Sequence, residues 1–378
     1  MAGEESRPMY SDSTRVVRAG LPEAEPGQPF LPGPVLASTF ALGPEGYQPG
    51  VDSYGRPDSP TRRLLESAIG ELEGGECLAF ATGMAAISAV LLTVPRAGDA
   101  VLVPSDGYYL ARAFAQQALP RVGVSVVEAP TAGPYPSFEG IRLVLLESPS
   151  NPGLDVCDIA ALADAAHAAG ALVAVDNTTP SPLGANPLAL GADIVVASGT
   201  KALTGHSDML LGYVVVRDPE LLAALRTWRN ATGAIPGAFD CWLAHRSLAT
   251  LDLRLARQTA NAAAVSAALS THAAVRSVRW PGLPTDPANL IAAQQMRRIP
   301  GIVTFELAGA AEVTAFFAAS KLVTPATSFG GLHTTGDRRA QWGDPVPAGL
   351  IRLSCGIEDT VDLVADITAA LDAVAAES

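Results

Sequence analysis

The sequence predicts an α/β fold, in which a large domain built on a mostly parallel sheet precedes a smaller α+β domain. Short β-branched runs alternate with helical patterns over the middle of the chain, and the right-handed crossover of such β–α–β units makes the strands parallel. From about residue 273 onward, short strands alternate with helices in a pattern typical of an α+β domain. The length of 378 residues exceeds one typical core and indicates roughly two domains.

Composition favours a well-buried globular protein. Apolar residues make up 48% of the chain and charged residues 17%. The net charge of −13 argues against a nucleic acid or an anionic membrane as a partner. The polar N-terminus lacks the apolar segment of a signal peptide, and no apolar run is long enough to span a bilayer. We therefore expect a cytoplasmic protein.

The four cysteines lie far apart and form no spacing that is typical of a metal site. We expect them to be small buried residues of a reducing compartment, and we expect no metal. They are Cys77, Cys157, Cys241 and Cys355.

The first 50 residues are rich in proline and glycine and show little periodicity. We expect an extended arm there, lying across a neighbouring subunit, since such a segment makes few contacts with itself. A disordered tail is the alternative, and the scattered Phe30, Leu36 and Phe40 argue against it. We place the large domain at 51–245 and the smaller domain at 246–378, with a long connecting helix around 243–264.

The elements of the large domain follow in order from residue 61. Leu65 and Leu72 lie on one helical face, and Gly74 ends that helix. The strand CLAF follows, and then a turn at Thr82 and Gly83 opens a long apolar helix. The first N–H groups of a helix are unpaired and bind anions, so this turn is a candidate phosphate site. A glycine that serves only packing is the alternative.

Further strands are expected at 100–104, 122–127, 141–147 and 171–176, with helices that end near residue 118 and cover 156–169. Ligands of parallel sheets gather at the carboxyl ends of the strands. Polar residues follow two of these strands and the strand at 194–198. They are Glu147 and Asn151, then Asp176 and Asn177, then the segment from Ser198 to Lys201. We interpret this edge as one site, and unrelated loop caps are the alternative.

One lysine stands in a loop of small residues between two buried strands, IVVAS and LLGYVVV. Lysine avoids protein interiors unless it has a partner or a function, and an amine here suits a carbonyl cofactor held as a Schiff base. The residue is Lys201, and the hydroxyls of Ser198 and Thr200 beside it suit a phosphate. A surface loop lysine is the alternative.

Pyridoxal phosphate requires four groups from a protein, and the sequence offers a candidate for each. A lysine binds its carbonyl carbon, a carboxylate keeps the pyridine nitrogen protonated, an aromatic ring stacks on it, and N–H and O–H donors bind its phosphate. Lys201 and Asp176 supply the first two, and Tyr108 or Tyr109 supplies the ring. The turn before the apolar helix supplies donors.

Several motifs occur along the chain in a fixed order: SYGRPDSPT, ATGMAAI, ESPSNP, AVDNT, SGTKALTGHSD, SFGG and IRLSCGIED. With the early stretch STRVVRAG they cover nearly the whole chain. On these motifs the chain resembles the Cys/Met-metabolism family of pyridoxal-phosphate enzymes, which includes cystathionine γ-lyases, cystathionine γ-synthases and methionine γ-lyases. The resemblance implies a PLP-dependent transferase fold of type I, like that of aspartate aminotransferase, with pyridoxal 5'-phosphate as the cofactor.

The resemblance also implies a role for each matching residue. Lys201 corresponds to the Schiff-base lysine and Asp176 to the partner of the pyridine nitrogen. Tyr54 and Arg56 correspond to a pair that reaches the phosphate from a neighbouring subunit, which implies an oligomer, usually a homotetramer of two dimers. The other correspondences are Gly83, Met84, Ser198 and Thr200 as phosphate donors, Asn151 at the cofactor's ring oxygen, Tyr108 on the ring, and Arg352 with Ser328 at the substrate α-carboxylate; a structural ion pair is the alternative for Arg352.

The chain departs from the family pattern in two places. The stretch with the stacking tyrosine is SDGYYLAR instead of a YGGTY-like sequence, so we expect Tyr108 in that role, with Tyr109 as the alternative. The segment after SFGG places His333 where the family usually has a glutamate, at the distal end of the substrate. His206 in GHSD is expected to be a structural loop residue, with a catalytic base as the alternative.

The implied reaction is a γ-elimination on a sulfur amino acid, in which we expect L-cystathionine to give L-cysteine, 2-oxobutanoate and ammonia. Lys201 then moves protons at Cα and Cβ, and Tyr108 protonates the leaving thiol. γ-Replacement on an O-acylhomoserine, methionine γ-lyase activity and a specialised biosynthetic γ-substitution share the same cofactor residues and stay open. A non-catalytic fold that only binds a partner is a further alternative, and the intact Lys201, Asp176 and Arg352 argue against it.

Overall fold

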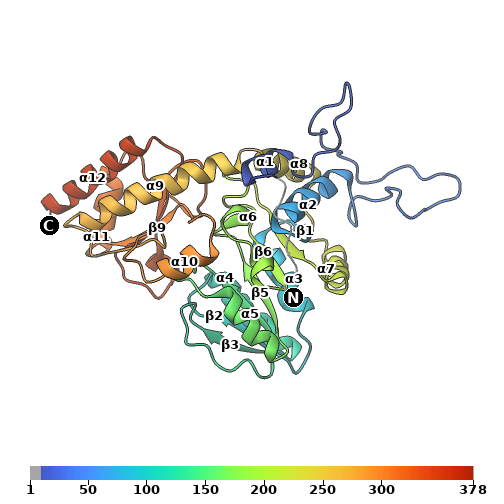
Figure 1. The fold of residues 1–378 in the computed structure, drawn as a ribbon, viewed down its shortest axis with the longest axis horizontal. Helices are drawn as coiled ribbons and strands as arrows, with labels where there is room; N and C mark the ends of the chain where they lie inside the picture. Colours follow the sequence, from blue (N-terminus) through green and yellow to red (C-terminus); the bar gives the residue numbers. More distant parts are fainter. Residues whose placement is uncertain (1–9, 378) are drawn as a thin grey trace.

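The computed structural model describes residues 10–377, so the start of the polar N-terminal stretch lies outside the described residues. The larger unit is a seven-stranded sheet with the order β1-β7-β6-β5-β4-β2-β3 (Figure 1). The strands from β6 to β3 pair in parallel, and β7 pairs antiparallel with β1 and β6, which confirms the mostly parallel sheet. The strands are β1 (Glu76–Phe80), β2 (Ala100–Pro104), β3 (Ser125–Ala129), β4 (Ile141–Glu147), β5 (Leu172–Asp176), β6 (Ile194–Ala197) and β7 (Gly212–Val216).

Helices cover both faces of this sheet, because strand side chains alternate between the two faces. On one face α3, α4 and α7 pack against Phe80, Val103 and Val214. On the other face α2 and α8 pack over Val215, and α5 packs over Val144. The helices are α2 (Pro60–Glu73), α3 (Gly83–Thr93), α4 (Tyr109–Ala118), α5 (Ile159–Ala168), α6 (Ser181–Gly184), α7 (Pro219–Thr232) and α8 (Ala238–Leu248).

The smaller unit is a five-stranded sheet with the order β10-β11-β12-β9-β8. Its core includes Phe305, Phe316 and Leu353 and is closed by α9, α11 and α12. The α+β character expected for the C-terminal part is confirmed. The elements are α9 (Leu251–Thr271), β8 (Ser277–Arg279), α10 (Asn289–Gln295), β9 (Ile302–Glu306), α11 (Ala310–Ala319), β10 (Thr324–Pro325), β11 (Thr335–Arg338), β12 (Leu350–Ser354) and α12 (Thr360–Glu377).

The single connecting helix expected around 243–264 is wrong, because two helices occupy that range. α8 ends at Leu248 and α9 begins at Leu251. The side chain of Arg254 donates to the carbonyl oxygen of Ser247 (3.0 Å), which is the acceptor that a continuous helix would use for its own backbone. The carbonyl oxygen of Ser247, which loses its backbone partner at the break, therefore still accepts a hydrogen bond.

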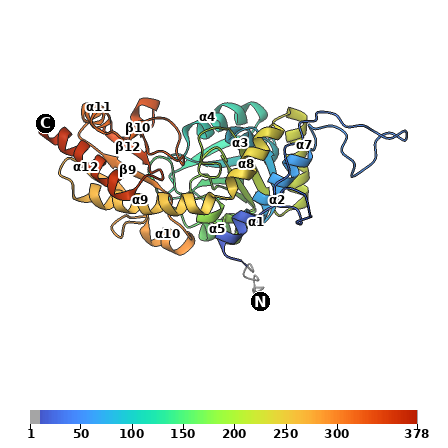
Figure 2. The ribbon, with the colours of Figure 1, turned by 90° about the horizontal axis from the view of Figure 1, so that it is seen from above.

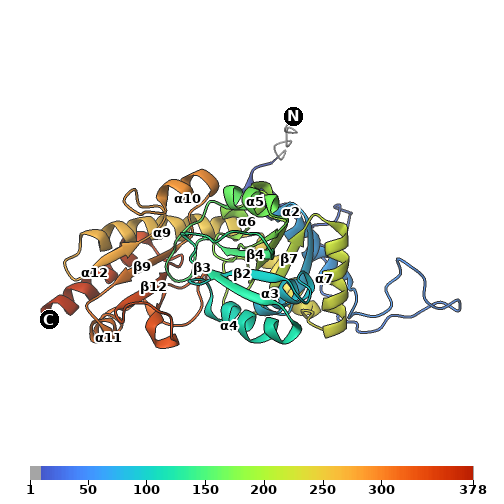
Figure 3. The same ribbon diagram turned by 90° about the horizontal axis from the view of Figure 1, so that it is seen from below.

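The expectation of an extended segment throughout residues 1–50 is also wrong in part. The helix α1 (Asp12–Arg18) packs on the body through buried Val16, and Nε2 of His245 lies 2.8 Å from the carbonyl oxygen of Ala19. Residues 21–59 contain no helix and extend as long loops at the end of the molecule opposite α12 (Figures 2 and 3). The contact of this arm with a second subunit stays a prediction.

Most remaining boundaries agree with the sequence, and the exceptions have local causes. The strand expected at 122–127 is β3, shifted because the chain from Leu119 to Val122 forms a 3-10 helix. α5 starts at Ile159, where the side chain of Asp158 caps the helix by accepting from the Ala161 N–H (3.0 Å). All four cysteines are free and buried, as expected. Within residues 10–377 no helix is both long enough and apolar enough to cross a membrane.

Candidate active site

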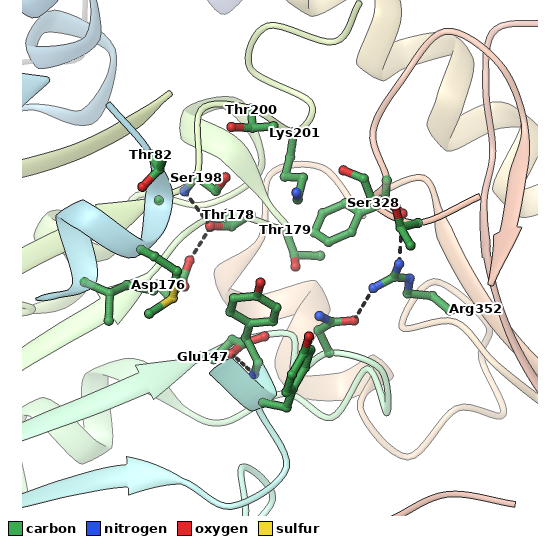
Figure 4. Close-up of a pocket in the computed structure, with 18 of the residues that line it drawn as sticks. Thr82, Glu147, Asp176, Thr178, Thr179, Ser198, Thr200, Lys201, Ser328 and Arg352 are labelled. Carbon is green, nitrogen blue, oxygen red and sulfur yellow. Dashed lines mark hydrogen bonds between the residues drawn. The ribbon is translucent and has the colours of Figure 1, made fainter. Parts of the chain in front are cut away.

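A cavity of about 330 Å³ lies where the carboxyl ends of β4, β5 and β6 meet the smaller unit (Figure 4). Side chains from the starts of α3 and α4 and from β12 complete its wall. The structure brings most of the predicted site residues together here, and their chemical roles stay predictions. These residues are Gly83, Met84, Tyr108, Asn151, Asp176, Ser198, Thr200, Lys201, Ser328 and Arg352.

Lys201 points into this cavity, between Asp176 and Arg352 (Figure 4). Its Nζ lies 5.5 Å from the centre of the Phe329 ring and, within residues 10–377, makes neither a hydrogen bond nor an ion pair. Burial and the Arg352 cation together lower the pKa of Lys201 to about 8, and Asp176 opposes the shift. More of this amine is therefore unprotonated at neutral pH than in an exposed lysine.

Two carboxylates end neighbouring strands of the sheet. Glu147 closes β4, Asp176 closes β5, and the two face each other in the register. Asp176 accepts a hydrogen bond from the backbone N–H of Thr178 (2.9 Å), and Glu147 accepts one from that of Tyr108 (2.7 Å). Burial raises the pKa of both carboxyls, and Asp176 raises that of Glu147 further. Thr178 and Lys201 lower the pKa of Asp176, whereas the charge of Asp176 raises that of Glu147, so these shifts favour a proton on Glu147 over one on Asp176.

The turn into α3 forms a cradle for an anion. The hydroxyl of Thr82 caps the helix by accepting from the Ala85 N–H (3.0 Å). A Cβ atom at Gly83 would lie 2.7 Å from the Cβ of Ser198, so only glycine allows this approach. The N–H of Ser198 donates to the hydroxyl of Thr178 (2.8 Å), which fixes the opposite wall. The N–H groups of Gly83 and Met84, which precede the capped N–H of Ala85, have no acceptor within the helix and are available to a phosphate.

Thr200 also lines the cavity, but its hydroxyl already makes two hydrogen bonds. It accepts from the N–H of Leu211 (2.9 Å) and donates to the carbonyl oxygen of the same residue (3.2 Å). The role of Thr200 as a phosphate donor therefore stays a prediction, and it requires that the hydroxyl gives up the bond that it donates.

Both tyrosines of the SDGYYLAR stretch line the cavity. The ring centres of Tyr108 and Tyr109 lie 5.4 Å apart with an angle of 72° between the planes. Burial raises the pKa of Tyr108, and the neighbouring Tyr109 adds to the shift, so the Tyr108 hydroxyl keeps its proton at neutral pH. The geometry of the described chain leaves both rings as candidates for stacking on a cofactor.

Arg352 lies on the smaller unit, at the opposite wall from the strand ends. Its Nη1 donates to the side-chain oxygen of Asn151 (2.7 Å) and its Nη2 to the carbonyl oxygen of Ser328 (2.8 Å). Ser328 presents this carbonyl from a left-handed backbone conformation (φ 74°). Burial and the Arg339 cation together lower the pKa of Arg352 to about 10, so the guanidinium stays charged at neutral pH. A buried, oriented guanidinium suits a carboxylate.

Tyr54 and Arg56 do not line the cavity of their own chain. Arg56 donates to the carbonyl oxygen of Asn230 (2.7 Å), and its guanidinium carbon lies 5.5 Å from the centre of the exposed Tyr54 ring. Their predicted contact with the phosphate of a neighbouring subunit is compatible with this location and stays a prediction.

The two histidines singled out in the sequence lie outside the cavity. His333 is exposed and lines an adjoining cavity of about 630 Å³, which shares Ser328 and Phe329 with the first cavity. Nδ1 of His206 lies 2.6 Å from the carbonyl oxygen of Thr204, within its own loop. This contact fits the structural role expected for His206.

Sequence reasoning missed several residues that line the cavity. Thr178 and Thr179 follow Asp176 at a strand end, and this position is a signal that would have found them. Phe329 lies in the SFGG motif but has an ordinary hydrophobic character. Arg339 and Trp342 carried no signal, because they come from the turn between β11 and β12 and reach the site only through tertiary packing.

These residues fit pyridoxal phosphate. Lys201 offers an amine that makes neither a hydrogen bond nor an ion pair among the described residues, Asp176 a buried carboxylate, and Gly83 a cradle that a side chain would fill. On a seven-stranded sheet followed by a smaller C-terminal sheet, the arrangement defines a pyridoxal-phosphate-dependent enzyme of fold type I.

The chain belongs to the family of Cys/Met metabolism PLP-dependent enzymes, whose family model matches residues 13–372. It is 52% identical to "Putative cystathionine gamma-lyase" of Streptomyces coelicolor, over 98% of this chain and 96% of that protein. It is 37% identical to a cystathionine gamma-synthase of Mycobacterium bovis, over 95% of this chain and 96% of that protein. The crystal structure of a methionine gamma lyase from Micromonospora echinospora matches 96% of this chain and 99% of its own, with a TM-score of 0.89 and 36% identity. The substrate of this family is an amino acid, and pyridoxal phosphate is the cofactor.

Proposed function

We propose that this protein catalyses a γ-elimination on L-cystathionine, which together with one water gives L-cysteine, 2-oxobutanoate and ammonia. The observation that carries the proposal is the position of the Lys201 amine, which makes neither a hydrogen bond nor an ion pair within residues 10–377 and lies between Asp176 and Arg352. The choice of cystathionine is supported by the name of the relative that is 52% identical to this chain. We further propose a homotetramer of two dimers in the cytoplasm, as the family resemblance implies.

Each side chain has a separate task in this mechanism. When bound, pyridoxal phosphate supplies an electron-withdrawing ring that stabilises negative charge at the substrate α-carbon. The carboxylate of Asp176 holds the proton on the pyridine nitrogen, and the guanidinium of Arg352 binds the substrate α-carboxylate. Nζ of Lys201 takes the α-proton and then moves a proton at Cβ, which its lowered pKa favours. Tyr108, which keeps its proton at neutral pH, gives it to the leaving sulfur.

The distal half of the substrate extends toward the adjoining cavity that contains His333. γ-Replacement on an O-acylhomoserine, methionine γ-lyase activity and a specialised γ-substitution would use the same residues around the cofactor. These reactions differ in what occupies the distal cavity, so His333 is the residue that we expect to discriminate between them. At this position a histidine side chain binds a distal carboxylate of the substrate better than a glutamate, because the glutamate would repel the like charge.

A product assay on the purified, cofactor-loaded protein tests the proposal. L-Cystathionine is supplied alone, O-succinylhomoserine is supplied with L-cysteine, and L-methionine is supplied alone. The proposal requires 2-oxobutanoate and L-cysteine from cystathionine as the fastest reaction. Net synthesis of cystathionine from the acylhomoserine would assign γ-replacement instead, and faster turnover of methionine would assign a methionine lyase. The same assays are run on Lys201→Ala. Its matched control is Lys321→Ala, since Lys321 is exposed and is the chain's other lysine.

A further inference from the structure

A buried network of four alternating charges lies behind the substrate side of the cavity. It runs from Arg352 through Asp337 and Arg339 to Asp344, and the exposed fraction of each side chain is 7% or less. Nη2 of Arg352 lies 3.3 Å from Asp337 Oδ2, and Nη1 of Arg339 lies 2.7 Å from the same oxygen. Nε of Arg339 lies 2.8 Å from Asp344. The two cations and two anions balance, so the network is neutral.

Asp337 is the member of this network with the most complete set of hydrogen bonds. Besides the two arginines, Nε2 of Gln341 (3.1 Å) and Nε1 of Trp342 (2.9 Å) donate to its Oδ1. Four donors use nearly all the acceptor sites of a carboxylate. A carboxylate with these four partners is held in a single position.

Asp337 is also coupled to Arg352 through the backbone. β11 pairs antiparallel with β12, and Asp337 faces Arg352 in the register. Arg339, Trp342 and Arg352 line the cavity, whereas Asp337 does not. The carboxylate therefore touches the guanidinium from behind, on the side away from the site.

We propose that Asp337 is a positioning residue, which orients the Arg352 guanidinium for the α-carboxylate of the substrate. The two terminal nitrogens of Arg352 donate to Asn151, Ser328 and Asp337. These three bonds fix the plane of the guanidinium, and the N–H groups that remain serve the incoming carboxylate. The inference rests on the proposed role of Arg352 as the carboxylate-binding residue.

Positioning and simple charge balance predict opposite effects for Asp337→Asn. Loss of one negative charge leaves the network with a net positive charge, which by itself would strengthen the binding of a carboxylate. Loss of positioning weakens it, because an amide in place of this carboxylate could no longer hold two guanidinium groups. Asp344→Asn is the matched control, since it removes the same charge from the same network but touches Arg339 and not Arg352.

The test titrates the absorbance of the bound cofactor with two ligands that have no leaving group to eliminate, L-alanine and L-alaninamide, of which the second lacks the carboxylate. It needs no turnover, so it gives a result whatever the natural substrate is. We expect Asp337→Asn to weaken L-alanine binding by about tenfold or more, to change L-alaninamide binding by less than about twofold, and to keep the melting temperature near that of Asp344→Asn. Asp344→Asn keeps the Asp337 contact and loses only the charge, so L-alanine should bind it as tightly as the wild type or slightly more tightly, and its affinity for L-alaninamide should be nearly unchanged.

Three outcomes would overturn the inference. They are tighter alanine binding by Asp337→Asn, equal weakening of alanine and alaninamide, and equal effects of the two substitutions. If Asp337→Asn does not fold, Asp337→Glu replaces it, since this variant keeps the charge and moves the carboxylate. It must weaken the binding of L-alanine more than the binding of L-alaninamide. Arg352→Gln separates the two proposals: unchanged alanine affinity in that variant would remove the proposed role of Arg352 itself.

Discussion

Glu147 and Asp176 face each other across β4 and β5, so two buried carboxyls stand side by side at the cofactor edge of the sheet. Two like charges buried next to each other do not both ionise at neutral pH. Thr178 and Lys201 favour the charged form of Asp176, whereas the charge of Asp176 raises the pKa of Glu147. Both effects favour a single proton on the pair, held by Glu147.

This relationship predicts unequal effects of two isosteric substitutions. Glu147→Gln mimics the protonated carboxyl and can still accept from the Tyr108 N–H, so we expect it to retain most of the activity. Asp176→Asn removes the charge that holds the proton on the pyridine nitrogen, and kcat should fall by about 10²-fold or more. Steady-state kinetics of the two proteins at equal cofactor occupancy measure this. Equal losses in both variants would contradict the assignment of the proton to Glu147.

The lowered pKa of Lys201 predicts how cofactor uptake depends on pH. Only the neutral amine attacks a carbonyl carbon, and in the cofactor-free protein this form increases as the pH rises through about 8. The uptake rate should rise with pH and level off above that value. Arg352→Gln removes a cation that lowers this pKa, so its curve should lie at higher pH. Stopped-flow absorbance after mixing with pyridoxal phosphate gives both curves, and a flat profile between about pH 6 and pH 9 would contradict them.

The same shift has a consequence for the stability of the cofactor-free protein. The pKa of Lys201 is about 8 in the folded protein and 10.5 in the unfolded chain. Between these two values the unfolded chain therefore binds a proton at Lys201 that the folded protein does not bind. This difference lowers the free energy of unfolding by its full amount below about pH 8, and the loss shrinks as the pH rises toward 10.5. Lys201→Met should therefore raise the Tm of the cofactor-free protein more at about pH 7 than at about pH 10. Exposed Lys321→Met is the control and should change the Tm little at either pH.

The positions of Tyr54 and Arg56 predict that a complete site needs two subunits. In their own chain these residues lie outside the cavity, next to an arm with exposed Phe30 and Leu36 side chains. Arg56→Ala and Lys201→Ala should each lose at least about tenfold of the activity. When the two variants are dissociated together and reassembled, about a quarter of the wild-type activity should return, because random pairing restores one site in half of the dimers. Mixing without any recovery would show that Arg56 acts within its own chain or not at all.

Local patterns were sufficient for most of the large sheet and for the residues nearest the cofactor. Lys201, Asp176 and Gly83 each stand next to the strand or helix that positions them, so the order of elements along the chain indicates that they meet. Tertiary packing decided the rest. At the break before Leu251, the Arg254 side chain from the next turn binds the Ser247 carbonyl. The hydrophobic periodicity of the sequence does not reveal such a contact.

The substrate side of the site was less accessible to sequence reasoning for the same reason. Arg339 and Trp342 reach the cavity because β11 and β12 pair with Asp337 opposite Arg352. β11 has only four residues, TGDR, and shows no strand pattern of its own. The exposure of His333 in an adjoining cavity was likewise not readable from its place after SFGG.

Chemical trapping of the cofactor tests the assignment of Lys201 most directly. Borohydride reduces the carbon–nitrogen double bond between pyridoxal phosphate and a lysine, which leaves a stable adduct for peptide mapping by mass spectrometry. The sequence makes the result unambiguous, because Lys201 and Lys321 are its only lysines. We expect the adduct on the peptide that contains Lys201, and none on the peptide that contains Lys321. An adduct on Lys321 alone, or a loaded protein without any adduct, would contradict the site described above.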